Sequence, residues 1–100
     1  MKNFVLSKKA KEDLRKIAKY TENRWGKTQR NLYIKQFDEG FHLLSESPFV
    51  GNACDFIAKG YRRFPMGSHI IFYKETTKNK ITIIRILHQN MDVKPRISDP

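Results

Sequence analysis

Cysteine, acidic residues and long apolar runs are all scarce in this 100-residue sequence. The single cysteine, Cys54, excludes an internal disulfide and a zinc site built on several thiolates. No apolar run approaches the roughly 18 residues of a membrane-spanning helix. The apolar stretch Phe4–Leu6 is also shorter than the roughly seven residues that a signal peptide needs. These absences predict a protein of the reducing cytoplasm with no membrane segment.

The shortage of acidic residues leaves a strongly basic chain. Ten Asp and Glu stand against 20 Lys and Arg, which gives a formal net charge of +10. The excess is spread along the chain, with 11 basic and 6 acidic residues in positions 1–50 and 9 and 4 in positions 51–100. A uniformly positive domain is expected to attract an acidic partner such as nucleic acid, an acidic protein segment or an anionic surface. A lysine-rich solvated face without a partner explains the same composition, so charge alone selects no function.

The first half of the chain has the periodicity of helices. Phe4–Leu6 predicts a short opening strand, and Ser7 is suited to cap a helix that follows over Lys8–Arg24. The inward face of that helix has residues three and four apart, namely Ala10, Leu14, Ile17, Ala18, Thr21 and Trp25. Gly26 permits the left-handed conformation that ends a helix, so a very short turn is expected there.

A second helix is expected from near Thr28 to Ser47, where Pro48 prevents its continuation. Its predicted inward residues are Leu32 or Tyr33, Phe37, Phe41 and Leu44. Gly40 is unfavourable inside a helix by about 1 kcal/mol relative to alanine. We therefore expect the first helix to pack closely against the second at Gly40. The aromatic residues Trp25, Phe37 and Phe41 are expected in the core.

Beyond a loop at 48–59, the apolar period changes to the alternation of strands. Three strands are predicted at Gly60–Met66, His69–Glu75 and Lys80–Leu87, with Pro65 marking an edge or a bulge. The last strand is apolar on both faces, which is typical of a strand with a neighbour on each side. Arg85 interrupts it, and a charge there is unfavourable unless it is paired or faces a groove. Arg85 is therefore expected to bind a partner or to make a polar contact that holds the C-terminal segment.

The order β-α-α-β-β-β predicts the fold class. It indicates one α+β domain over residues 1–93, in which a helical hairpin packs on one face of an antiparallel sheet. Residues 94–100 contain no apolar pattern and are expected to form a loose tail.

Four motifs in this order carry a resemblance to a known family. Residues 60–73, GYRRFPMGSHIIFY, resemble the strand–turn–strand of ParE toxins. Residues 83–88, IIRILH, followed by Met91-Asp92, resemble the final strand of the family and its exit. The Leu6-Ser7 start of the first helix and the Trp25-Gly26 break between the helices agree with this resemblance. The resemblance covers residues 4–93, nearly the whole chain.

The resemblance implies a toxin of a type II toxin–antitoxin module with the RelE/ParE fold. Characterised ParE proteins poison DNA gyrase and are held inactive by a cognate antitoxin whose flexible segment wraps the toxin. The expected partners are therefore DNA gyrase and an acidic, partly disordered, ParD-like antitoxin, with which the toxin forms a hetero-oligomer. The implied inhibitor is not an enzyme, and it needs no metal and no cofactor.

The competing hypothesis is a ribosome-dependent mRNA endoribonuclease of the RelE/YoeB type. Cleavage through the 2′-hydroxyl needs cationic donors at the phosphate and an acid or a base, roles open here to Arg63, Arg85 and His88. Relatives of the YoeB type carry Arg after the His of the second strand and an aromatic hydroxyl after the C-terminal His. This chain has Ile70 and Gln89 at those positions. The resemblance therefore favours the inhibitor.

The candidate residues for binding the target or the antitoxin are drawn from the last three strands and their exit. They are Arg62, Arg63, Arg85, His88, Met91 and Asp92. Arg62 and Arg63 are adjacent on a strand, so their side chains are expected on opposite faces.

Overall fold

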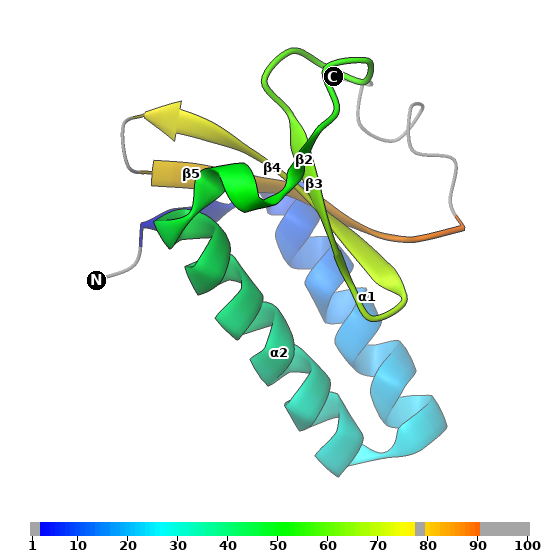
Figure 1. The fold of residues 1–100 in the computed structure, drawn as a ribbon. Coiled ribbons are helices and arrows are strands. Elements are labelled where there is room, and N and C mark those ends of the chain that lie inside the picture. Colours follow the sequence, from blue (N-terminus) through cyan, green and yellow to red (C-terminus); the bar gives the residue numbers. More distant parts are fainter. Residues whose placement is uncertain (1–2, 78–79, 91–100) are drawn as a thin grey trace.

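A computed structural model of the chain describes residues 3–77 and 80–90 (Figure 1). The elements follow the order β1 (Phe4–Leu6), α1 (Lys8–Trp25), α2 (Lys27–Glu46), the 3-10 turn η1 (Pro48–Val50), β2 (Asn52–Ala53), β3 (Arg62–Met66), β4 (His69–Thr77) and β5 (Lys80–His88). The predicted tail at 94–100 lies outside the described residues, as do Met91 and Asp92. Within the described part of the chain, no helix is long and apolar enough to cross a membrane.

The strands form one five-stranded sheet in the order β1-β5-β4-β3-β2, and both helices lie on one side of it (Figure 1). The predicted α+β fold with a helical hairpin on the sheet is confirmed. The prediction of a wholly antiparallel sheet is wrong, because β1 pairs with β5 in parallel while the other neighbours are antiparallel. The order of elements along the chain does not determine where β1 pairs. It takes the edge of β5 that β4 leaves free.

The connection between the two helices is a single glycine. Gly26 has a φ of 95°, which favours glycine, and its N–H donates to the carbonyl of Glu22 at 2.8 Å. Because one residue joins α1 to α2, the helices return side by side and cover the same face of the sheet (Figure 1).

The main core lies between the hairpin and the sheet. Its buried members are Phe4, Ala10, Ile17, Phe37, Phe41, Leu44, Ile71, Tyr73, Ile81, Ile83 and Ile86. The predicted inward positions Phe37, Phe41 and Leu44 are confirmed, and Tyr33, not Leu32, packs against this cluster. Buried apolar area of this kind supplies most of the favourable free energy of folding.

Two predictions about packing are wrong. Trp25 was expected in the core, but it is the last residue of α1 and 65% exposed. Gly40 was expected to face the first helix, but a side chain there would collide with Met66 of β3. The close approach is therefore between α2 and the sheet.

The second face of the sheet is covered by the segment between β2 and β3. Cys54, Phe72 and Leu87 form a small buried cluster there, and Ile57 and Tyr61 pack against it. Cys54 is fully buried, and this burial is the largest cause of its raised thiol pKa. The predicted loop at 48–59 also contains the short turn η1 and strand β2, and β3 begins at Arg62 instead of Gly60.

Alanine substitutions at two apolar positions of α2 distinguish its buried face from its exposed face. Phe37→Ala removes a fully buried ring and is expected to lower the free energy of unfolding by about 3–5 kcal/mol. Leu32→Ala, at a side chain 51% exposed, is expected to change it by no more than about 0.5 kcal/mol. Urea denaturation of both variants checks this, and equal losses would contradict the described orientation of α2.

Candidate functional site

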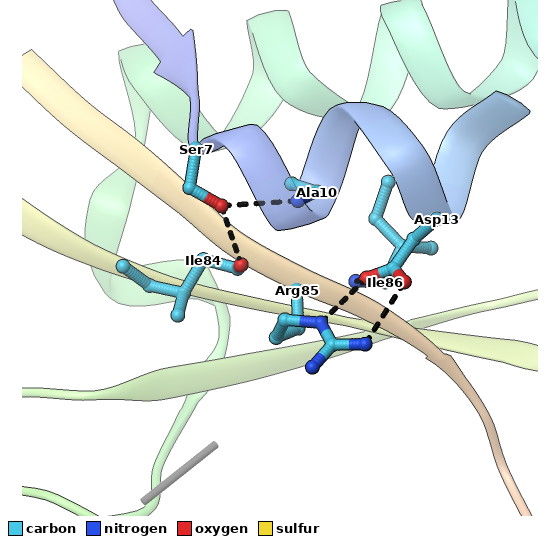
Figure 2. Close-up of polar contacts among 6 residues, drawn as sticks. All are labelled: Ser7, Ala10, Asp13, Ile84, Arg85 and Ile86. Atoms are coloured by element: carbon cyan, nitrogen blue, oxygen red, sulfur yellow. Dashed lines mark hydrogen bonds and ion pairs between the residues drawn. The ribbon is translucent and has the colours of Figure 1, made fainter. Parts of the chain in front are cut away.

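The edge of β5 nearest α1 is only partly covered by a strand. Pairing between β1 and β5 ends at Leu6 and Ile83, where the N–H of Ser7 donates to the carbonyl of Ile83 at 2.9 Å. Ser7 also caps α1 as predicted, because its Oγ accepts from the N–H of Ala10 at 3.0 Å. The same hydroxyl donates to the carbonyl of Ile84 at 2.7 Å, which extends the contact with β5 (Figure 2).

Asp13, six residues after Ser7, continues this edge. Its Oδ2 accepts from the N–H of Ile86 at 3.0 Å (Figure 2). The pairing of β4 with β5 is irregular here, because Tyr73 pairs with Ile83 and the preceding residue of β4 pairs with Arg85. Ile84 is therefore an extra residue in β5. The N-cap residue Ser7 and Asp13 of α1 thus satisfy backbone groups of β5 beyond the end of β1.

The Asp13 carboxylate also binds the guanidinium of Arg85. Nε lies 2.7 Å from Oδ2 and Nη2 lies 2.9 Å from Oδ1, so the pair is bidentate (Figure 2). Only 16% of the Arg85 side chain and 10% of the Asp13 side chain are exposed. The hydrogen bond to Asp13 is the largest cause of the raised pKa of Arg85. The polar contact expected of Arg85 therefore joins β5 to α1.

Arg62 likewise has an internal role. Its Nε and Nη2 donate to the carbonyl of Gly51 at 3.1 and 2.7 Å, and its guanidinium lies 5.1 Å from the ring centroid of Phe49. The hydroxyl of buried Tyr73 accepts from the N–H of Gly51 at 3.0 Å and donates to Pro48. Together these contacts hold the segment 48–53 against β3 and β4. Arg63, the next residue, is exposed.

The residues named for RNA cleavage are distributed over both faces of the sheet. Arg63, Phe72 and Arg85 occupy one row across β3, β4 and β5. His88 is three residues after Arg85, and an odd spacing along a strand places side chains on opposite faces. The clusters agree, since Ile86 packs in the helix-side core and Leu87 in the cluster on the other face. The sheet therefore separates His88 from Arg63, whereas the guanidinium of Arg85 reaches the edge of β5 and is bound there by Asp13.

His88 instead has a histidine as its neighbour. His69 and His88 are directly paired across β4 and β5, with ring centroids 5.5 Å apart and planes at 82°. The Nδ1 of His69 lies 2.8 Å from the hydroxyl of Tyr33, and the Nδ1 of His88 accepts from the N–H of Asn90 at 3.2 Å. Burial is the largest cause of the lowered pKa of His69, and the charge of His88 lowers it further while Asp13 opposes the shift.

The two histidines line a hollow between the end of α1 and the turn from β3 to β4. This hollow of about 540 Å³, here called the histidine groove, is lined by Lys16, Ile17, Tyr20, Arg24, Trp25, Ser68, His69 and His88. A smaller adjoining hollow of about 240 Å³ shares Tyr20, Trp25, Ser68 and His69 with it. Within the described residues, no group of three or more His, Cys, Asp or Glu side chains is placed to hold a metal ion.

Sequence reasoning missed most of this groove. In the sequence, His69 matters only because Ile70 follows it where YoeB-type relatives carry Arg. Helical spacing predicts Trp25 in the core. The available signal is the turn between the predicted strands His69–Glu75 and Lys80–Leu87, because pairing outward from it brings the start of the first strand opposite the end of the second, where His69 and His88 lie. Tyr20 carries no such signal, since it is one exposed residue in a charged helix. Met91 and Asp92 lie outside the described residues, so their predicted role stays a prediction.

The chain is similar to one family over almost its entire length. Residues 4–93 match the family described as "ParE toxin of type II toxin-antitoxin system, parDE". Toxin ParE1 of Mycobacterium tuberculosis is 38% identical over 90 residues, which cover 90% of this chain and 92% of that protein. Toxin ParE1 of Caulobacter vibrioides is 36% identical over 97 residues, covering 97% and 99%.

The fold has a counterpart among solved structures. A chain of the structure titled "Chromosomal ParDE TA system from P. aeruginosa" superimposes with a TM-score of 0.72, covering 88% of this chain and 96% of that one. The two are 18% identical, so this likeness supports the fold alone.

Removing the Asp13 carboxylate tests its role at the α1–β5 edge. Asp13→Ala leaves Arg85 without this carboxylate and the N–H of Ile86 without an acceptor, so the free energy of unfolding is expected to fall by about 3–5 kcal/mol. Glu12→Ala removes the same charge from the exposed neighbour and is expected to change it by about 0.5 kcal/mol or less. Chemical denaturation measures both, and a loss no larger for Asp13 than for Glu12 would refute the assignment.

The lowered pKa of His69 has a defined consequence for stability. The folded protein favours the neutral form of His69. The contribution of this residue to stability is therefore complete above its pKa in the unfolded chain, about 6.5, and is lost as pH falls toward its lower pKa in the folded protein. His69→Gln is expected to reduce the loss of stability as pH falls below about 6.5. NMR titration of the imidazoles gives the pKa directly. His88→Gln should raise the pKa of His69 by removing a repelling charge, and a His69 pKa at or above 6.5 in the unmodified chain would contradict the described burial.

Proposed function

The chain belongs to the ParE toxin family of type II toxin–antitoxin systems, and from this premise we propose that it inhibits growth by binding and poisoning DNA gyrase. The inhibitor acts stoichiometrically and is neutralised by a cognate ParD-like antitoxin. Its net charge of +10 attracts acidic surfaces, which matches an acidic antitoxin.

The observation that carries the choice of an inhibitor over a nuclease is the separation of the cleavage residues. Phosphoryl chemistry needs cationic donors and an acid or a base around one phosphate. Here the guanidinium of Arg85 is bound by Asp13, and His88 is on the opposite face of the sheet from Arg63. This arrangement supports binding instead of cleavage.

The edge of the sheet at β3 is suited to the antitoxin. Within the described residues, β2 pairs only with Arg62 and Arg63, which leaves the outer edge of Phe64–Met66 without a strand. Beside this edge lies a shallow hollow of about 320 Å³ lined by Gln36, Glu39, Gly40, Leu43, Phe64 and Met66. An extended antitoxin segment can add a strand there and place an apolar side chain in the hollow.

The candidate gyrase-binding residues fall into two groups, those that stay candidates for direct contact and those whose side chains bind other parts of the fold. Arg63 and His88 are retained, together with Met91 and Asp92 from the exit of β5. Arg62 and Arg85 contribute indirectly, because their guanidinium groups hold other segments of the fold. Loss of toxicity on replacing Arg62 or Arg85 is therefore expected to accompany loss of stability.

Parallel assays of gyrase and of ribosome-bound mRNA test the function. The purified chain is expected to inhibit gyrase supercoiling and accumulate cleaved DNA while mRNA stays intact, and the antitoxin encoded beside it should restore supercoiling. Arg63→Ala is expected to weaken inhibition by roughly 10-fold, from loss of one charged contact, without lowering stability, and Lys59→Ala serves as the matched exposed control. Cleaved mRNA with unaffected supercoiling would overturn the proposal.

A further inference from the structure

We propose that the histidine groove binds single-stranded nucleic acid, with a base stacked on Trp25 or Tyr20 and phosphates held by Lys16 and Arg24. The proposal goes beyond inhibition of gyrase and does not depend on it. Three features of the groove support it: a stripe on α1, two exposed rings, and the polar wall opposite them.

The stripe alternates cation, aromatic ring and cation. Lys16, Tyr20 and Arg24 are four residues apart, so they lie on one face of α1, and all three line the groove. The rise of an α-helix separates Lys16 from Arg24 by about 12 Å along the axis. The two cations can therefore hold different phosphates of one strand, with Tyr20 between them.

The rings of Tyr20 and Trp25 are both largely open to solvent. Tyr20 is 63% exposed and Trp25 is 65% exposed, although both border a hollow. Rings in this setting offer faces on which bases stack, a contact that does not depend on base identity. The guanidinium of Arg24 lies 5.5 Å from the ring centroid of Trp25, and guanidinium planes also stack on bases.

The opposite wall is polar and carries no negative charge. It consists of Ser68, His69 and His88, and the adjoining hollow adds Gln29 and Tyr33. In the described part of the chain, no Asp or Glu lines either hollow. The volume of about 540 Å³ is in the usual range for small-ligand sites and can admit a nucleotide. An acidic peptide would match the cations, but its carboxylates would leave both exposed rings without a flat partner.

Trp25 is the only tryptophan in the sequence, so its fluorescence reports on the groove alone. Titration of the purified chain with an oligodeoxythymidylate of about eight nucleotides is expected to quench this fluorescence to saturation. The affinity should fall as salt rises, because phosphate contacts release counterions. Oligoglutamate of the same charge is the comparison probe.

Variants separate stacking from general charge attraction, with a dye-labelled oligonucleotide and anisotropy as the readout. Trp25→Leu is expected to raise Kd at least about fivefold, whereas Phe56→Leu, at another exposed ring outside the groove, should leave it unchanged. Lys16→Gln is expected to weaken binding more than Lys9→Gln, although each removes one positive charge. Circular dichroism confirms that every variant is folded.

Three outcomes overturn the proposal. These are no quenching by the oligonucleotide, equal affinities for all four variants, and quenching by oligoglutamate without quenching by the oligonucleotide. The last result would assign the groove to an acidic peptide. Because gyrase inhibition is measured separately, failure here leaves the proposed function unaffected, and failure there leaves this groove unaffected.

Discussion

The carboxylate of Asp13 is the contact on which the arrangement of the whole domain depends. One side chain of α1 binds both the guanidinium of Arg85 and the backbone N–H of Ile86 (Figure 2). A buried charge left without its partner is strongly destabilising, so neither residue can be removed alone without loss. With the Ser7 hydroxyl, Asp13 extends the edge of β5 beyond the end of β1. The helical hairpin is therefore fixed to the sheet by directional bonds as well as by apolar packing.

This attachment determines which side chains remain available for partners. Arg85 is committed to α1 and Arg62 to the segment 48–53, so two of the most conspicuous cations serve the fold. The register that places Arg85 opposite Phe72 also places His88 opposite His69 on the helix side of the sheet. The strongly basic chain thus presents an exposed Arg63 on one part of its surface and the histidine groove on another. Of the residues considered for RNA cleavage, Arg63 and His88 therefore lie on opposite faces of the sheet.

Features set by local sequence were predictable, and those set by distant pairing were not. The helices, the Ser7 cap, the Gly26 turn and the buried Phe37 follow from periodicity and from residue chemistry over a few positions. The parallel pairing of β1 and the partner of Arg85 involve residues more than 70 positions apart. For Asp13 a signal was present, because it follows Ala10 by three residues and precedes Ile17 by four, on the inward face of α1. The prediction of a buried Trp25 was wrong because the helical spacing of apolar residues continues to the last residue of α1, whereas the sheet does not extend far enough to cover that residue.

A double-mutant cycle between Asp13 and Arg85 tests the central claim most directly. Asp13→Leu, Arg85→Met and the double variant are unfolded in urea, and the coupling energy is obtained from the four free energies of unfolding. The account predicts a coupling of about 2 kcal/mol or more, with the double variant more stable than at least one single variant. A coupling near zero, with additive losses, would show that the two side chains act independently and would contradict the account.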